Sequence, residues 1–327
     1  MTQMVELRGV SRRFSKPLDF TTKLLRRAGM VVKHDVVHAV DSVDLNIRQG
    51  EVLGLVGESG CGKSTLGRMV AGILPQSEGS ILWRGQDRAA MPEKARLATQ
   101  MIFQDPFASL NPRARVQDIV GEAPLVHGLT KRADLADYVD EQLRRAGLDP
   151  GLKRRDPHQF SGGQRQRIGI ARALAVQPEF LVCDEAVAAL DVSIQAQILN
   201  LFMKLRAELN LTYLFISHDL GVVEHLSDRV CIMYLGRVVE QAPAEEVFAR
   251  ANHPYTQSLL ASVPRLEARK RAFASVKGEI PSPLAPPGGC HFHPRCPMAM
   301  DRCKQERPVL REVAPGHLSA CHLNEGR

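Results

Sequence analysis

The chain has 327 residues, enough to bury a large core and to form one large domain with a smaller one, or two domains. Hydrophobic residues make up 44% and charged residues 24% of the chain, which is ordinary for a globular protein. No apolar run approaches the roughly 18–20 residues of a membrane helix, and the N-terminus lacks the apolar segment of a signal peptide. The sequence therefore argues against a membrane-spanning protein and predicts a cytoplasmic chain.

The formal net charge is +7, and part of this excess lies between residues 11 and 33, where seven Lys or Arg residues accompany only Asp19. A positive chain can bind nucleic acid, anionic lipid or phosphate ligands. Two interpretations of the stretch stay open. It is either a solvated insertion or a patch that faces anionic lipid headgroups.

Strands are predicted at residues 5–10 and 36–47, and apolar residues alternate with polar ones in the second segment. Phe14 follows the first strand. Its ring is a candidate to stack on a nucleotide base, but an isolated aromatic side chain is equally often part of the core. Both roles stay open at this stage.

The most specific motif is a glycine-rich loop between an apolar strand at 52–56 and a helix predicted from Leu66 to Ile73. It fits the phosphate-binding pattern G-x-x-x-x-G-K-[ST], in which backbone N–H groups and the helix N-terminus face phosphate oxygens. Lys63 would reach the β- and γ-phosphates, and Ser64 would complete the coordination of Mg²⁺. The loop consists of Gly57, Glu58, Ser59, Gly60, Cys61, Gly62, Lys63, Ser64 and Thr65.

Three weaker patterns follow the loop. A short strand ends in Gln104 before a proline, where the side chain can touch Mg²⁺ or orient a water molecule. Apolar residues spaced by threes and fours then predict a helical subdomain at roughly 116–160. Another glycine-rich helix start, where free N–H groups can face an anion, is formed by Ser161, Gly162, Gly163 and Gln164.

Two apolar strands deliver polar side chains at their ends. Strand 180–183 ends in Asp184 and Glu185, the acidic pair that a nucleotide hydrolase needs. We expect Asp184 to hold Mg²⁺ through water and Glu185 to act as the general base. Strand 212–216 leads to His218, which would contact the γ-phosphate and hold the attacking water.

In this order and spacing the motifs resemble the nucleotide-binding subunits of ATP-binding-cassette (ABC) transporters, over nearly the whole chain. The Ser-Gly-Gly-Gln segment at 161–164 discriminates best, because ordinary phosphate-loop enzymes lack it. Gln104 matches the glutamine loop of that family, Asp191 lies in the loop after its acidic strand end, and His218 matches its switch histidine. A narrower resemblance, to the oligopeptide/dipeptide importer ATPases, rests on segments 57–65, 103–106, 193–197, 253–256 and 290–297.

The resemblance implies an α/β fold, a phosphate-loop NTPase (RecA-like) core with antiparallel-β and α-helical subdomains. It implies an ABC nucleotide-binding domain over 1–241 and a small Cys-rich extension over 242–327. Two subunits, identical or different, would enclose two ATP molecules, each between the phosphate loop of one subunit and residues 161–164 of the other.

Further partners are implied by the same resemblance. They are two transmembrane permease subunits and, indirectly, a periplasmic or extracellular substrate-binding protein. The chain would be a peripheral protein on the cytoplasmic face of the inner membrane, where it would energise import of peptides or similar small solutes.

Four of the seven cysteines crowd into the C-terminal tail. Their spacing lacks the C-x₂-C element of most structural zinc sites, so spacing alone leaves metal ligation and free thiols open. The importer resemblance implies a [4Fe–4S] cluster, with zinc as the alternative. Its ligands would be Cys290, Cys296, Cys303 and Cys321.

Two other functions compete with peptide import. A soluble ABC-type ATPase that acts on nucleic acid or ribosomes usually carries two cassettes or a long coiled-coil insertion, and this sequence has neither. A non-catalytic regulatory cassette is disfavoured because Lys63, Asp184, Glu185 and His218 are all intact. The leading hypothesis is therefore a transport ATPase with no specific nucleic-acid partner.

Overall fold

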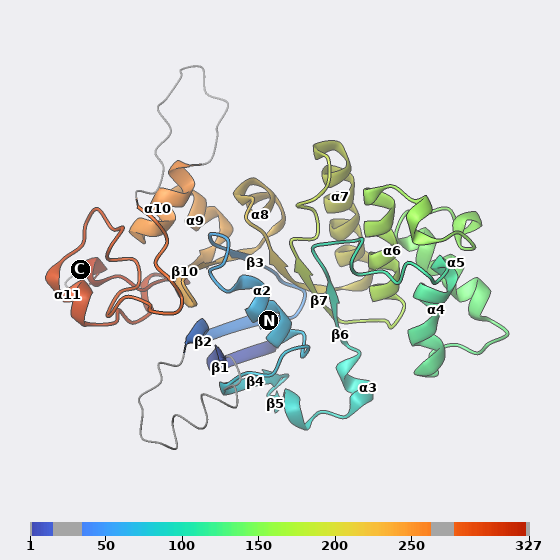
Figure 1. Cartoon of the computed structure of the whole chain (residues 1–327), viewed down its shortest axis with the longest axis horizontal. Helices are drawn as coiled ribbons and strands as arrows, with labels where there is room; N and C mark the ends of the chain where they lie inside the picture. The colour runs from blue at the N-terminus through green and yellow to red at the C-terminus, as the bar shows by residue number, and fades with distance from the viewer. Residues whose placement is uncertain (1, 16–34, 263–277, 325–327) are drawn as a thin grey trace, which may run out of the picture.

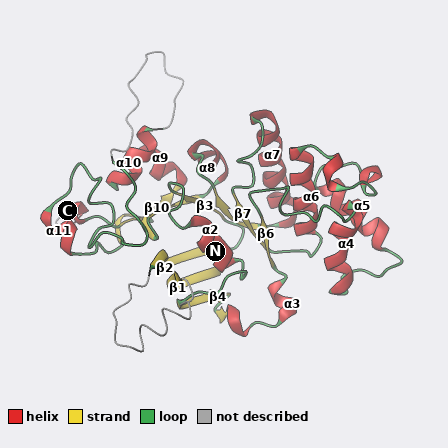
Figure 2. Ribbon diagram, viewed as in Figure 1, coloured by secondary structure: helices red, strands yellow, loops and turns green. Residues whose placement is uncertain are grey.

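The computed structural model describes residues 2–15, 35–262 and 278–324. Its centre is a sheet in which five parallel strands lie in the order β9-β3-β8-β7-β6 (Figures 1 and 2). Parallel strands buried on both faces are mostly apolar, and these strands are apolar except for a few residues at their ends. The five strands are β3 (Val52–Val56), β6 (Thr99–Ile102), β7 (Phe180–Asp184), β8 (Thr212–Ile216) and β9 (Arg229–Tyr234).

Alternate side chains of the central strands enter two different cores, as the two-residue period of a strand requires. In β7, Leu181 and Cys183 belong to a core with the helical layer, whereas Phe180 and Val182 face the opposite side. The helical layer on the first side includes α7 (Val192–Leu209), whose Phe202 is fully buried. The predicted strand 212–216 is confirmed.

A second, antiparallel sheet packs on the other core in the order β2-β1-β4-β5. The strand predictions at 5–10 and 36–47 are confirmed, but the first strand is longer than predicted, so Arg12 and Arg13 lie in it. Arg13 pairs with Glu78 of the neighbouring strand at 2.7 Å, so the basic stretch is in part sheet; residues 16–34 lie outside the described residues. The strands are β1 (Gln3–Ser15), β2 (Val36–Arg48), β4 (Glu78–Trp83) and β5 (Gln86–Asp87).

Helices gather at one end of the molecule, at the right of Figure 1, where the helical subdomain was predicted. Its described helices include α4 (Val116–Val126) and α5 (Leu135–Arg145), which pack with α6 (Gly162–Leu174) through Ile119, Val139 and Ile168. Among the described residues, no helix has both the length and the hydrophobicity needed to cross a membrane. Short helices elsewhere are α2 (Lys63–Val70), α3 (Glu93–Arg96) and α8 (Leu220–Leu226).

The C-terminal part extends the central sheet at the opposite end of the molecule. Strand β10 (Arg237–Pro243) pairs with β9 on one side and with β12 on the other, and β12 pairs with β11. The predicted division at 241/242 falls inside β10, and it stays a prediction. The remaining elements are α9 (Ala244–Arg250), α10 (Pro254–Ala261), α11 (Asp301–Gln305), β11 (Arg311–Ala314) and β12 (His317–Ser319).

Candidate functional site

The phosphate loop joins β3 to α2, as the motif requires. Helix α2 begins at Lys63, three residues before the predicted start, because Gly62 adopts a left-handed conformation (φ 106°) and acts as its N-cap. The loop is also packed tightly. A Cβ atom on Gly57 would lie 2.1 Å from the carbonyl oxygen of Met233, and one on Gly62 would lie 2.1 Å from that of Ala39. Only glycine fits at these two positions.

Lys63 is buried beneath the loop. Its Nζ donates to the carbonyl oxygens of Gly57 at 2.8 Å and Glu58 at 3.1 Å. The ammonium group thus lies inside the curl of the loop, next to the backbone that would face phosphates. Burial raises the pKa of the neighbouring Cys61 thiol to about 11, so this thiol stays protonated and unreactive.

Ser64 and Asp184 meet although they are 120 residues apart in the chain. Ser64 Oγ donates to Asp184 Oδ1 at 2.8 Å. Burial raises the pKa of Asp184, and the Ser64 hydrogen bond partly opposes this shift. A hydroxyl and a carboxylate beside a phosphate loop are ligands that Mg²⁺ prefers, so the residues fit the predicted ion.

Three predicted catalytic side chains converge next to this pair. Glu185 Oε2 accepts from Gln104 Nε2 at 2.8 Å and lies 3.3 Å from His218 Nδ1. Glu185 also has a positive φ of 49°, which is costly for a residue with a side chain and is common at functional sites. The arrangement places one carboxylate between an amide and an imidazole at the strand ends.

The segment at 161–164 lies elsewhere. Ser161 and Gln164 form a capping box at the start of α6, in which the Ser161 N–H donates to Gln164 Oε1 at 3.0 Å. Figure 1 shows α6 among the helices, separated from α2 by β6 and β7. Within one chain, therefore, the two glycine-rich segments do not meet.

Two predicted nucleotide contacts stand at the surface. Phe14 is 38% exposed near the end of β1, with the Arg12 guanidinium 4.7 Å from its ring centre. Asp191 is exposed and precedes the first turn of α7 as its N-cap. Neither side chain is part of the core.

Comparison with known proteins agrees with this geometry. A model of the ABC transporter family matches residues 40–188, and a model of the C-terminal region of oligopeptide/dipeptide transporters matches residues 239–303. The oligopeptide transport ATP-binding protein AppF of Bacillus subtilis (strain 168) is 52% identical over 295 residues, covering 88% of this chain and 90% of AppF. The chain belongs to the oligopeptide/dipeptide importer family of ABC transporter ATP-binding subunits.

Solved structures confirm the predicted fold class. CbiO1 from Clostridium perfringens, part of an ABC transporter complex, is 29% identical with a TM-score of 0.62, covering 76% of this chain and 92% of that one. The ATP-binding cassette MJ0796, solved as a dimer with ADP and phosphate, is 26% identical with a TM-score of 0.61. That match covers 74% of this importer subunit and 99% of MJ0796.

The four C-terminal cysteines of this importer subunit line one small cavity. Its volume is about 10 Å³, close to the minimum for a single water molecule. In the described part of the chain, no group of three or more His, Cys, Asp or Glu side chains is arranged to hold a metal ion. The side chains as placed therefore do not fit the predicted cluster or zinc ion. The cysteines are Cys290, Cys296, Cys303 and Cys321.

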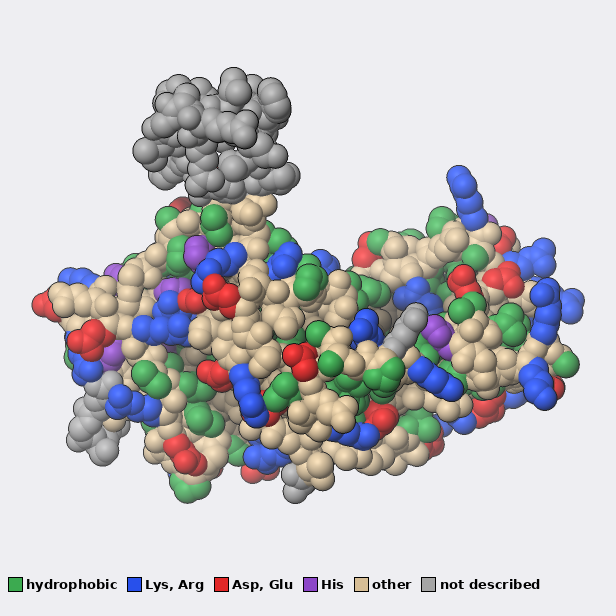
Figure 3. Space-filling view, turned by 90° about the horizontal axis from the view of Figure 1, so that it is seen from below, with side chains coloured by type: hydrophobic (Ala, Val, Ile, Leu, Met, Phe, Trp, Pro, Cys, Tyr) green, Lys and Arg blue, Asp and Glu red, His purple; other side chains and the backbone are tan. Residues whose placement is uncertain are grey.

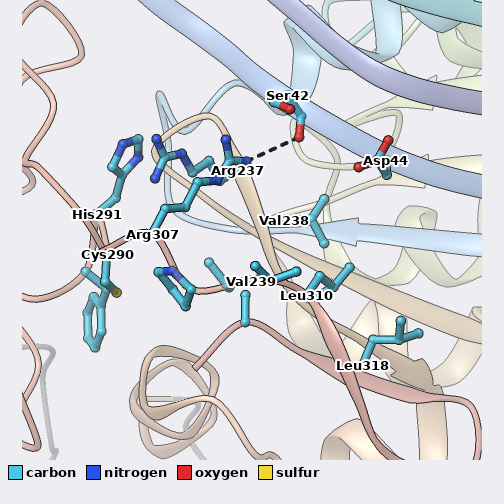
Figure 4. Close-up of a pocket in the computed structure, with 14 residues that line it drawn as sticks. Ser42, Asp44, Arg237, Val238, Val239, Cys290, His291, Arg307, Leu310 and Leu318 are labelled. Atoms are coloured by element: carbon cyan, nitrogen blue, oxygen red, sulfur yellow. Dashed lines mark hydrogen bonds between the residues drawn. The ribbon is translucent and has the colours of Figure 1, made fainter. Parts of the chain in front are cut away.

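A larger cavity, of about 430 Å³, lies where the extension meets the core (Figure 4). Arg237 pairs with Asp41 at 2.7 Å and donates to the carbonyl oxygen of Gly289 at 2.9 Å. Arg307 donates to the carbonyl oxygen of Ser42 at 3.3 Å from the other side. The extension is thus attached to the core by polar contacts at this boundary.

Sequence reasoning missed two side chains that touch the phosphate loop. Arg295 and Tyr255 both contact Glu58. Each stands in a segment that the importer resemblance used, at 290–297 and 253–256, but nothing in a single sequence connects either segment to residue 58.

Gly62→Ala and Gly60→Ala form a matched pair within the loop. Both glycines have positive φ, but a Cβ on Gly60 meets nothing within 4 Å, whereas one on Gly62 clashes with Ala39. We expect Gly60→Ala to lower the free energy of unfolding by the backbone strain alone, about 1–2 kcal/mol. Gly62→Ala should lower it clearly more, because β2 has to move. Denaturant titration of the nucleotide-free protein measures both; equal losses would contradict the close approach.

Proposed function

We propose that this chain hydrolyses ATP and thereby energises the import of di- or oligopeptides, or similar small solutes, across the cytoplasmic membrane. The observation that carries the proposal is the convergence of Gln104, Glu185 and His218 beside the Ser64–Asp184 pair. A chain 52% identical to an oligopeptide transport ATP-binding protein supports the peptide class.

Each side chain has a role in the proposed reaction. Ser64 and Gln104, and Asp184 through water, would hold Mg²⁺, and the ion would neutralise charge that develops on the phosphates. Glu185 takes a proton from the attacking water. His218 orients this water and contacts the γ-phosphate. The contacts of the Gln104 side chain depend on whether ATP and Mg²⁺ occupy the site. Lys63 exchanges its loop carbonyls for phosphate oxygens when ATP binds.

The site of one chain is half of the working site. Residues 161–164 of a second ATPase subunit, which form the N-terminus of its α6, complete each ATP site across a head-to-tail dimer. Phe14 stacks on the adenine base, and Asp191 lies near the nucleotide. Separation of the two glycine-rich segments within one chain supports this arrangement. We divide the chain into a nucleotide-binding domain, 1–241, and an extension, 242–327.

The helical end of the molecule is the proposed contact with two permease subunits, which a substrate-binding protein serves from outside. A groove of about 500 Å³ lies between α4 and its neighbours, and Phe107, close to Gln104, is 62% exposed. Figure 3 shows Lys and Arg gathered at this end, which suits a peripheral position beside anionic headgroups on the cytoplasmic face. The exposed cations in this region include Arg113, Arg115, Lys131, Arg132, Arg144, Arg154 and Arg155.

A role on nucleic acid or ribosomes receives no support from the relatives, since AppF and CbiO1 both belong to transporters. Pull-down with the permease subunits, against salt-sensitive binding to nucleic acid, separates the two functions.

Glu185→Gln tests the catalytic assignment. The substitution keeps the shape of the side chain and removes the base, so ATP should still bind while hydrolysis falls by about 10²- to 10⁴-fold. A stable ATP-bound dimer should accumulate, visible by size-exclusion chromatography. Glu179→Gln is the control, because Glu179 is a surface carboxylate paired with Arg84. Normal turnover in Glu185→Gln would remove Glu185 from its role.

The finer cofactor proposal concerns the cysteine cavity. We propose that Cys290, Cys296, Cys303 and Cys321 bind a [4Fe–4S] cluster, with zinc as the alternative. Support comes from the fact that all four cysteines line one cavity. Binding would require the thiols to move together and to deprotonate, since burial raises the pKa of Cys290 to about 11.

Metal analysis of anaerobically purified protein tests this cofactor. Iron with matching acid-labile sulfide, lost in Cys296→Ser, is the expected result. Colourless protein with stoichiometric zinc would show that the ligand is zinc and not a cluster. Metal-free protein would refute both the cluster and the zinc assignment. Cys231→Ser is the control, because Cys231 is buried in β9.

A further inference from the structure

Glu58, the second residue of the phosphate loop, is held by the C-terminal part of the chain. Arg295 Nη1 and Nη2 donate to its two carboxylate oxygens at 2.7 and 3.0 Å. The Glu58 N–H donates to Tyr255 Oη at 3.0 Å. Its carbonyl oxygen accepts from Lys63 at 3.1 Å. Every polar group of this loop residue therefore has a partner.

Arg295 is itself fixed. Its side chain is 4% exposed, and Nη1 also lies 3.4 Å from Tyr234 Oη. A planar guanidinium that binds a carboxylate through two parallel hydrogen bonds fixes direction as well as distance. Beneath it, Tyr234 contacts Tyr255 and Phe292, with ring centroids 4.6 and 5.3 Å apart. Arg295 thus reaches the phosphate loop from a cluster of closely packed aromatic rings.

The position of Tyr255 is also fixed, by His253 two residues before it. His253 is buried, and burial lowers its pKa to about 4, so its ring is neutral. Its Nδ1 accepts from the Tyr255 N–H at 3.1 Å and caps the start of α10. Glu240 fixes His253 in turn, accepting from its backbone N–H at 3.0 Å. The segment at 253–256 therefore aims a tyrosine hydroxyl at the loop.

If the Arg295–Glu58 ion pair served only to attach the C-terminal extension to the core, a contact with the Glu58 side chain would be sufficient. Here the backbone N–H is held as well, and this bond sets the orientation of the peptide that opens the loop. Lys63 must release the Glu58 carbonyl to reach phosphate, so Arg295 and Tyr255 are the contacts that remain during binding.

We infer that Arg295 and Tyr255 are positioning residues of the ATP site, which fix the phosphate loop in its binding conformation through Glu58. The C-terminal extension is then a working part of the ATP site of its own subunit. The inference rests on the proposed role of the loop in binding ATP, which the unmodified chain tests separately.

Arg295→Gln in the full chain tests the inference. The dissociation constant for Mg–ATP should rise about tenfold to a hundredfold, the range expected on losing a charged hydrogen-bonded pair. In the transporter assembled with its permease, KM for ATP should rise while kcat stays close to normal, because Gln104, Glu185 and His218 are untouched. Arg295→Lys, which keeps the charge but loses the paired geometry, should be intermediate.

Arg250→Gln is the matched control, because it removes the same charge from a pair with Glu246 whose arginine is 76% exposed. It should leave ATP affinity unchanged. Thermal unfolding of each nucleotide-free variant identifies one that fails to fold. If Arg295→Gln does not fold, Tyr255→Phe replaces it, since it deletes only the hydroxyl, and a rise in the dissociation constant of about tenfold is expected.

Three results would overturn the inference. They are normal ATP affinity in folded Arg295→Gln, normal affinity in Tyr255→Phe, and a loss confined to kcat. If the unmodified chain itself fails to bind Mg–ATP, the proposed function fails instead, so the two failures are distinguishable.

Discussion

The parallel pairing of β3, β8 and β7 is the constraint on which the site depends. Parallel strands end at one edge of their sheet, so the residues that follow them meet whatever their distance in sequence. The phosphate loop follows β3, Glu185 follows β7, and His218 follows β8. Gln104 arrives at the same edge after β6. The order of the strands in the sheet therefore brings the catalytic side chains together, and each loop has only to supply a suitable side chain.

Attachment of the extension follows a different principle. Buried or partly buried charged pairs connect it to the core, among them Arg307 with Asp41 and Arg295 with Glu58. Such pairs add little net stability, because desolvation offsets the attraction, but any other arrangement leaves a charge unpaired. They consequently specify one position for the extension. A part that has to hold a phosphate loop at fixed geometry benefits from this specificity more than from additional apolar area.

Local motifs made much of the fold and the candidate site predictable. The loop at 57–65, the acidic pair after β7 and the strand at 212–216 all follow from patterns within a few residues. The contacts of Glu58 could not be predicted, since they join positions 197 and 237 residues apart and one sequence carries no record of pairing. The arrangement of the four C-terminal cysteines could not be predicted for a similar reason. Spacing gives ligand identity, while the distance between thiols depends on how the surrounding chain packs.

The bond between Glu58 and Arg295 also bears on the order in which the protein is made. Glu58 of the phosphate loop leaves the ribosome 237 residues before Arg295, which binds it in the folded chain. At roughly 5–20 residues per second, the loop waits about 10–50 s without this contact. A nascent chain, or one truncated before Arg295, therefore carries the complete phosphate-loop motif without the contact between Glu58 and Arg295. If the inferred role of Arg295 holds, ATP binding by such a chain would be about tenfold to a hundredfold weaker until this arginine has been synthesised and has folded onto the loop.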